Sequence, residues 1–164
     1  MRLFIAIQLD PQMKEYLSSV QDQFRDRNIR GNFTPEENFH LTLAFIGEYP
    51  RPEDVLDVIR EVEFEPFGIT LDQVGCFDNL WWIGLKENPT LTQVVKRLRY
   101  GLTQAGIPFD KKRFKAHITL LRRADYAKGQ IGAITSKPIC MKVDRICLMR
   151  STRGKHGMIY TEIN

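Results

Sequence analysis

The amino-acid sequence predicts an α+β fold made of two related halves, each a small antiparallel sheet with helices on its outer face. Alternating apolar runs typical of strands are interspersed with segments of helical periodicity. A His-x-Thr frame with apolar flanks occurs twice, within residues 39–45 and 115–120. A helix start made of a capping side chain and a proline also occurs twice, at Asp10-Pro11 and Asn88-Pro89. Together these features indicate an internal duplication, with two polar sheet faces opposed across a central cleft.

The individual elements follow from local pattern. Strands are expected over residues 2–8, 39–45, 67–77, 80–86, 115–123, 139–150 and 158–163, and helices over 11–28, 53–61 and 89–105. Residues 2–8 have the composition of a strand buried on both faces, and 78–79 form the turn of a hairpin. Residues 31–38 are expected to be a polar lead-in, 124–136 an irregular loop and 151–157 a turn. Because no linker or low-complexity tract divides the chain, we expect a single bilobal domain over residues 1–164.

Composition limits the class of protein. The chain has 164 residues, of which 43% are hydrophobic and 27% charged, which is typical of a globular domain with a real core. A net charge of +4 and a pI near 9.0 favour an anionic partner without requiring one. The apolar run at residues 3–9 is too short for a signal peptide, and no window has the length of a membrane span. We therefore expect a cytoplasmic protein that does not bind membranes.

The three cysteines argue against a disulfide framework or a zinc site. Cys76, Cys140 and Cys147 are odd in number and form no C-x-x-C pair. If Cys140 and Cys147 shared a strand, their odd separation would place them on opposite faces. We expect buried thiols in a reducing compartment, and no metal or cofactor.

The duplicated frame places the same two chemical groups side by side in each half. On a strand, residues i and i+2 share a face and lie about 6.6 Å apart. His40 and Thr42 are such a pair, and so are His117 and Thr119. The chain has only three His, and two of them occupy this frame. The opposite face of each strand is apolar, and on the first strand this predicts that Phe39 and the more distant Phe45 belong to the core.

Two imidazoles and two hydroxyls around one cleft suit a phosphodiester. Imidazole can take or give a proton near neutral pH, so one ring can activate the attacking group while the other protonates the leaving oxygen. Hydroxyl groups can hold the non-bridging oxygens, through charge-assisted hydrogen bonds that each contribute roughly 1.5–3 kcal/mol. This division of roles requires no metal, and no carboxylate accompanies either His in a zincin-like motif.

At these positions the sequence resembles a known family. His40-Leu41-Thr42-Leu43 and His117-Ile118-Thr119-Leu120 are similar to the paired HxTx motifs of the two-histidine (2H) phosphoesterases. More narrowly, the chain resembles the RNA 2′,3′-cyclic phosphodiesterases, historically called 2′-5′ RNA ligases. The resemblance extends over the opening residues 1–7, residues 37–48 and 114–122, and the closing 148–151 with Gly157 and Tyr160. The family often has Trp where this chain has Phe33, and Pro where it has Ala116.

The resemblance implies a bilobal fold with pseudo-twofold symmetry and hydrolysis of an RNA 2′,3′-cyclic phosphate end to a 2′-phosphate. It implies that His40 gives a proton to the departing 3′ oxygen and that His117 is the base acting on water. Thr42 and Thr119 would hold phosphate oxygens, and Arg122 would add positive charge. The pseudo-symmetry allows the two His roles to be exchanged. The expected partner is RNA with a cyclic phosphate end, tRNA fragments included, bound by a monomer.

Other interpretations remain open from sequence alone. The same site could act on a small cyclic nucleotide or join RNA ends by a 2′-5′ linkage, and a non-catalytic RNA-binding domain is the alternative of another class. Thr42 and Thr119 could simply be good strand formers, and Arg122 a solvated cation. His156 is expected in an exposed turn. Because Trp81 and Trp82 alternate, at most one reaches the cleft. The following cations are expected either at a wet surface or in phosphate steering: Lys111, Lys112, Arg113 and Lys115.

Overall fold

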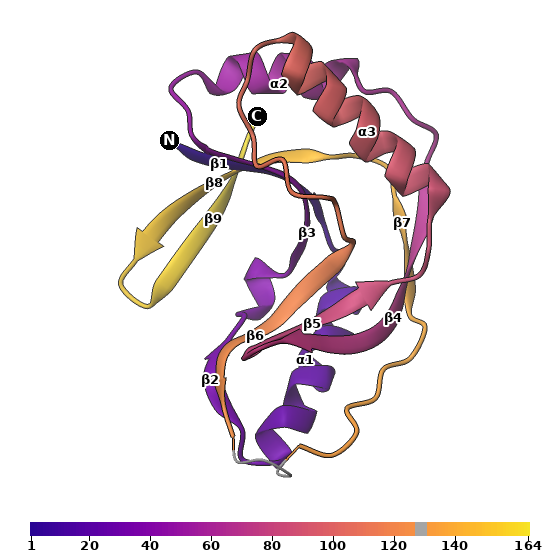
Figure 1. Ribbon diagram of the computed structural model, residues 1–164, viewed down its shortest axis with the longest axis vertical. Helices are drawn as coiled ribbons and strands as arrows, with labels where there is room; N and C mark the ends of the chain where they lie inside the picture. The colour runs from indigo at the N-terminus through magenta and orange to yellow at the C-terminus, as the bar shows by residue number, and fades with distance from the viewer. Residues whose placement is uncertain (127–130) are drawn as a thin grey trace.

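Two antiparallel sheets, in contact through their motif strands, form the framework of the protein (Figure 1). The computed structural model describes residues 1–126 and 131–164. The first sheet has the order β3 (His40–Glu48), β1 (Arg2–Gln8), β8 (Cys147–Gly154), β9 (Gly157–Ile163). The second has the order β2 (Arg30–Phe33), β6 (His117–Asp125), β5 (Leu80–Leu85), β4 (Phe67–Phe77), β7 (Cys140–Val143). The predicted α+β class with two facing antiparallel sheets is confirmed.

Each long helix packs on the sheet of the other half. Helix α1 (Pro11–Asp26) follows β1 in the chain but contacts β2 and β6, whereas α3 (Pro89–Gln104) follows β5 but contacts β3. Helix α2 (Pro52–Glu61) packs between α3 and β8. In Figure 1, α1 therefore lies at the bottom of the molecule, and α2 and α3 lie at the top. The duplicated unit is strand, helix and motif strand, as β1–α1–β3 and β5–α3–β6, and the two units exchange their helices.

The two crossing helices begin in the same way. The side chain of Asp10 accepts a hydrogen bond from the Met13 amide at 2.7 Å, and that of Asn88 accepts one from the Leu91 amide at 3.0 Å. Each capping residue is followed by a proline. Proline lacks an amide hydrogen, but no hydrogen bond is lost, because amides in the first turn of a helix have no partner within that helix. The predicted helix starts are therefore confirmed.

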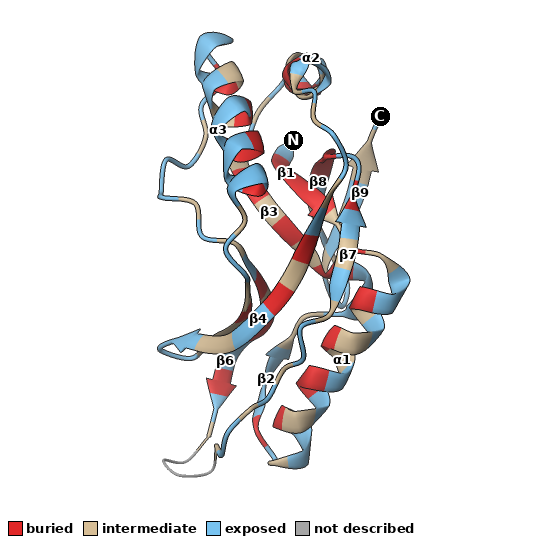
Figure 2. Ribbon diagram, turned by 90° about the vertical axis from the view of Figure 1, so that its right-hand side faces the viewer, coloured by how far each residue is buried: buried red, intermediate tan, exposed pale blue. Residues whose placement is uncertain are grey.

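One apolar core joins both sheets and helices α1, α2 and α3. It contains the inward residues of α1, α2 and α3 together with the buried side chains of strands from both sheets (Figure 2). Strand β1 is buried on both faces, as its composition predicts. Leu3, Ile5 and Ile7 enter this main core, while Phe4 and Ala6 join a smaller cluster on the other face.

Several boundaries differ from the prediction because strands change sheets. Residues 139–150 form two strands, since β7 pairs with β4 in the second sheet while β8 pairs with β1 in the first. Residues 31–38 contain most of β2 and a 3-10 turn, η1 (Glu36–Asn38). Strand β6 extends to Asp125 into the predicted loop, of which residues 127–130 lie outside the described chain. The predicted turn at 151–157 is shorter, because β8 continues to Gly154.

The prediction of three buried thiols is wrong for two of them. Cys147 is buried, but Cys76 and Cys140 are exposed. Cys140 begins the edge strand β7, and Cys76 lies near the outer end of the β4–β5 hairpin. Cys140 and Cys147 also belong to different sheets, so the question of a shared strand does not arise.

Candidate active site

Both motif strands contain a β-bulge directly after the His-x-Thr frame. In β3, Thr42 pairs with Ala6 and Ala44 with Ile5, which leaves an extra residue between them. In β6, Thr119 pairs with Trp82 and Leu121 with Trp81, which again leaves one extra residue. An extra residue reverses the alternation of side chains along a strand.

The bulges bring the fifth residue after each His back to the face of that His. A regular strand would place residues five apart on opposite faces. With the bulge, Arg122 joins His117 in the cleft, and Phe45 joins His40. The prediction that Phe45 faces away from His40 into the main core is therefore wrong, because the sequence pattern was followed without the extra residue; Phe45 is half-buried and packs on the smaller cluster that contains Phe4 and Ala6. Phe39 lies in the core as predicted, at 2% exposure.

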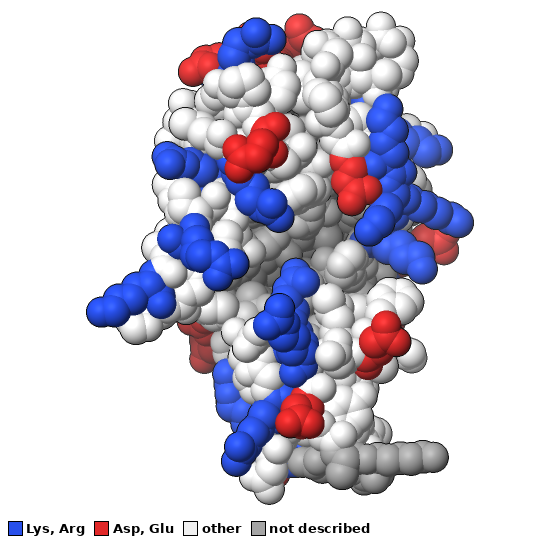
Figure 3. Space-filling model, turned by 60° about the vertical axis from the view of Figure 1, so that its left-hand side comes forward, with Lys and Arg blue, Asp and Glu red and all other residues white. Residues whose placement is uncertain are grey.

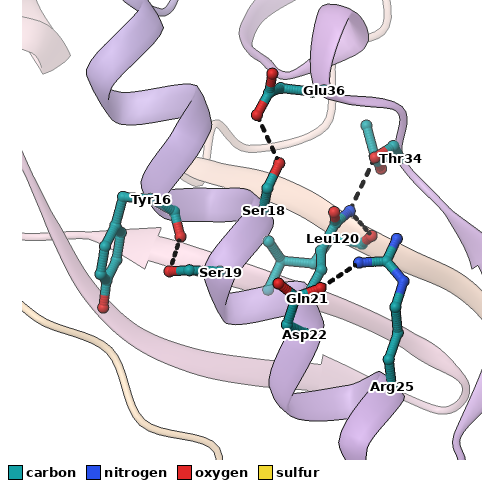
Figure 4. Close-up of polar contacts among 9 residues, drawn as sticks. All are labelled: Tyr16, Ser18, Ser19, Gln21, Asp22, Arg25, Thr34, Glu36 and Leu120. Carbon is teal, nitrogen blue, oxygen red and sulfur yellow. Dashed lines mark hydrogen bonds and ion pairs between the residues drawn. The ribbon is translucent and has the colours of Figure 1, made fainter.

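The crossing helices hold these two bulges by hydrogen bonds from equivalent positions. Gln21 of α1 donates to the carbonyl oxygens of Leu120 at 2.9 Å and Thr34 at 2.8 Å (Figure 4). Arg99 of α3 donates to the carbonyl oxygen of Leu43 through Nε at 3.2 Å and Nη2 at 3.0 Å. Both donors lie ten residues after the first proline of their helix, and both acceptors lie three residues after a motif His. The internal duplication thus includes the contacts that shape the site.

Both imidazoles are oriented by the carbonyl oxygen two residues before them. Nδ1 of His40 lies 2.7 Å from the Asn38 carbonyl oxygen, and Nδ1 of His117 lies 2.6 Å from that of Lys115. A carbonyl oxygen can only accept, so Nδ1 carries the hydrogen in each ring. Nε2 is therefore the nitrogen that can exchange a proton, and in His40 it lies 2.9 Å from the Thr42 hydroxyl.

A single cleft of about 740 Å³ contains both frames. All five residues singled out from the sequence line it, namely His40, Thr42, His117, Thr119 and Arg122. The lining residues that sequence reasoning did not single out for the site include Arg2, Phe4, Asn38, Ser151, Arg153 and Tyr160. Most of them lie on β1, β8 and β9, whose place in one sheet with the first motif strand was not predictable. Tyr160 had one signal, because it belongs to the closing pattern of the family resemblance.

The cleft is lined by more positive than negative charge. Arg2, Arg122 and Arg153 contribute cations, while Glu48 is the one carboxylate among the described lining residues. Glu48 already lies 3.1 Å from the N-terminal amino group. The face drawn in Figure 3 is hollowed at its centre, and Lys and Arg side chains surround the hollow. Such a cleft favours an anionic ligand.

Burial lowers the pKa of His40 below its ordinary value of 6.5. The hydrogen bond to the Asn38 carbonyl opposes this effect, since it stabilises the charged ring. Positive charges on Arg122 and Lys14 lower the pKa further. With no ligand bound, His40 is therefore mostly neutral at pH 7.

Aromatic rings pack beside each imidazole. The His40 ring lies 4.8 Å from that of Phe4 and 5.2 Å from that of Tyr160. The His117 ring lies 6.3 Å from that of Trp82. Trp81 points to the other face of its sheet and packs on Phe24 at 5.2 Å. The expectation that at most one of the two tryptophans reaches the cleft side is confirmed.

The remaining sequence expectations concern the surface. His156 is exposed in the turn between β8 and β9, as predicted. Residues 111–113 and Lys115 are exposed as well. Over residues 1–126 and 131–164, no three His, Cys, Asp or Glu residues gather as metal ligands would, and no helix has the length and apolar character of a membrane span.

Comparisons with known proteins find relatives that match over nearly the whole chain. An RNA 2′,3′-cyclic phosphodiesterase of Thermotoga maritima is 31% identical, over 98% of this chain and 91% of the relative. The crystal structure of Escherichia coli LigT complexed with 3′-AMP superposes with a TM-score of 0.81 at 27% identity, over 99% of this chain and 94% of that one. The crystal structure of TT0787 of Thermus thermophilus superposes with a TM-score of 0.79 at 29% identity, over 100% and 96% of the two chains. Residues 10–155 match the 2′-5′ RNA ligase superfamily, and the chain belongs to that superfamily.

Proposed function

We propose that this protein hydrolyses 2′,3′-cyclic phosphate ends of RNA to 2′-phosphates. The observation that carries the proposal is the pair of imidazoles in one cationic cleft, each with Nδ1 bound to a carbonyl oxygen and Nε2 left for proton transfer. The names of the relatives support the same reaction, because RNA 2′,3′-cyclic phosphodiesterases match over most of the chain.

In the proposed reaction, Nε2 of His117 takes a proton from a water molecule as that water attacks phosphorus. The bond between phosphorus and the 3′ oxygen breaks, and Nε2 of His40 gives a proton to the departing oxygen. The phosphate stays on the 2′ oxygen. His117 is the more exposed of the two rings, which supports its role beside the water. The hydroxyls of Thr42 and Thr119 and the Arg122 guanidinium hold the non-bridging oxygens.

The acid role requires a protonated His40, although burial lowers its pKa in the empty cleft. A bound phosphodiester brings a negative charge next to the ring, and an opposite charge favours the protonated form. Substrate binding thus raises the fraction of His40 that can donate a proton. In the proposed mechanism, binding of the phosphate therefore promotes protonation of His40, the general acid.

The test uses an oligoribonucleotide ending in a 2′,3′-cyclic phosphate, with the position of the product phosphate assigned by NMR. We expect a 2′-phosphate, formed equally well with EDTA present. His40→Ala and His117→Ala should each lower turnover by about 10²–10⁴-fold. His156→Ala is the matched control, since it removes an exposed imidazole from the β8–β9 turn. Unchanged turnover in both motif variants would contradict the proposal.

We further propose that the chain acts as one bilobal domain and as a monomer in the cytoplasm, on RNA ends that include tRNA fragments. The shared core of the two sheets and the single cleft between the motif strands support the first part. The monomeric state is tested by analytical ultracentrifugation at micromolar protein concentration, where we expect a species of 19.1 kDa.

A further inference from the structure

Next to the cleft, on the same side of the second sheet, lies a second hollow with an aromatic floor. It has a volume of about 400 Å³ and is lined by Phe77, Trp82, Lys115 and His117, among others. His117 also lines the main cleft, so the two spaces adjoin at this residue. The hollow therefore lies beside the imidazole at which the proposed chemistry occurs.

The rings in this hollow form a continuous row. The Trp82 ring lies 6.3 Å from the His117 ring, and the Phe77 ring lies 5.8 Å from the Trp82 ring. Phe77 is 59% exposed. Nζ of Lys115 lies 5.5 Å from the centre of the Phe77 ring. This cation lies over one face of the Phe77 ring, and exposed aromatic rings accompanied by a cation are what single-stranded nucleic acid binds through base stacking and phosphate contacts.

The backbone is adapted to keep the Trp82 indole in this position. Trp82 pairs with Gly75 across the β4–β5 hairpin. A Cβ atom at Gly75 would lie 2.4 Å from Cη2 of Trp82, so only glycine lets the indole lie over β4. The Trp82 ring is thereby held across the sheet, beside the exposed Phe77 side chain.

The proposed reaction explains why such a surface would adjoin His117. An RNA end continues from its cyclic phosphate into the preceding nucleotide, whose base needs a place outside the phosphate cleft. The row of rings begins at His117 and leads away from the cleft. Residues 111–115 include four exposed cations, of which Lys115 lines the hollow. Asp72 at the wall of the hollow is a carboxylate that repels phosphate but can accept hydrogen bonds from base amino groups.

We propose that Phe77 and Trp82, with Lys115, form a stacking subsite for the nucleobase of the penultimate nucleotide of an RNA substrate. This inference rests on the proposed function, and it assigns to the same site a preference for oligonucleotides over mononucleotides. Stacking has little dependence on base identity, so the subsite selects length rather than sequence.

The test compares three substrates with cyclic phosphate ends: a mononucleotide, a trinucleotide and the same trinucleotide with an abasic penultimate position. For the unmodified protein we expect kcat/KM to be about 5- to 100-fold higher for the complete trinucleotide than for the abasic one. Phe77→Ala should remove most of this difference while leaving turnover of the mononucleotide unchanged. Tyr100→Ala is the matched control, because Tyr100 is 67% exposed on α3 and lines neither hollow.

The inference is overturned if the complete and abasic trinucleotides react equally in the unmodified protein, or if their difference persists in Phe77→Ala. It is also overturned if Phe77→Ala lowers mononucleotide turnover as much as trinucleotide turnover.

A binding measurement distinguishes failure of the stacking subsite from failure of the proposed hydrolysis. Fluorescence anisotropy with a 5′-labelled trinucleotide ending in a 2′-phosphate needs no turnover. If no cyclic phosphate is hydrolysed but Phe77→Ala still weakens binding of the complete trinucleotide and not of the abasic one, the reaction is wrong and the subsite stands. If Phe77→Ala weakens binding of both trinucleotides equally, the subsite is wrong.

Discussion

Replacing Gln21 with leucine should distort the bulge of the second motif strand, although Gln21 itself lies outside the cleft. Gln21 is 2% exposed on α1 and does not line the cleft. Its side-chain amide donates to the Leu120 carbonyl at the bulge and to the Thr34 carbonyl on the neighbouring segment. Leucine fills a similar volume but has no donor, so Gln21→Leu removes both hydrogen bonds without opening a large cavity.

The expected loss in free energy of unfolding depends on which hydrogen-bond donors each carbonyl oxygen retains in the variant. The Leu120 oxygen retains the Thr34 amide as a donor at 3.0 Å, whereas the Thr34 oxygen loses its side-chain donor. Each lost hydrogen bond lowers the free energy of unfolding by about 1 kcal/mol, and a buried acceptor left without a partner costs about 1–3 kcal/mol. We therefore expect the free energy of unfolding to fall by about 2–4 kcal/mol, measured by urea denaturation. Gln12→Leu makes the same change at an exposed position of the same helix and should have little effect.

Activity is the readout that distinguishes positioning from stability alone. If Gln21 holds the bulge, its loss shifts Thr119 and Arg122 relative to His117, and displacements of about 1 Å can lower turnover 10²-fold. We expect kcat to fall by about 10- to 100-fold at temperatures where the variant is fully folded. A variant that is destabilised as expected but turns over normally would refute the positioning role, and an unchanged unfolding curve would refute the energetic reasoning itself.

Three further predictions concern protonation, thiol reactivity and capping. If His40 is the acid, activity is present below its folded pKa and lost above it. In His117→Ala, where His40 is the one motif imidazole left to titrate, the residual kcat/KM should therefore fall as pH rises through a value below about 6.5, and the residual kcat at higher pH because bound phosphate raises the pKa; a residual kcat/KM that rises with pH through that value would exchange the roles. Burial raises the pKa of the Cys147 thiol, so a thiol reagent should react quickly with Cys76 and Cys140 only, and rapid reaction at all three would contradict the burial. Asp10→Ala should lower the free energy of unfolding by about 1 kcal/mol through loss of the α1 cap, and an unchanged thermal midpoint would count against that cap.

Local chemistry made much of the fold predictable. Strands 2–8 and 67–77 were predicted with the observed boundaries, since their side-chain patterns are unambiguous and turn residues limit them. Asp10-Pro11 and Asn88-Pro89 identify helix starts because capping depends only on neighbouring residues. The duplicated frame also pointed to one shared cleft, and the structure has both frames in a single cleft.

What could not be predicted depends on pairing between distant strands. The bulges after Thr42 and Thr119 are defined by their partners in β1 and β5, so the sequence alone placed Phe45 in the core. The split of residues 139–150 between two sheets has the same cause. Tyr160 could not be placed beside His40 until the β8–β9 hairpin was known to complete the first sheet.

The exchange of helices between the halves makes the two ends of the chain mutually dependent. A break in the segment between α2 and β4 would leave one fragment with the first motif strand but without the α3 arginine, and the other with the second motif strand but without the α1 glutamine. Neither fragment carries the donor that shapes its own bulge. The reactive geometry is thus a property of the whole polypeptide, and assembly of either half of the cleft must wait until both halves have been synthesised.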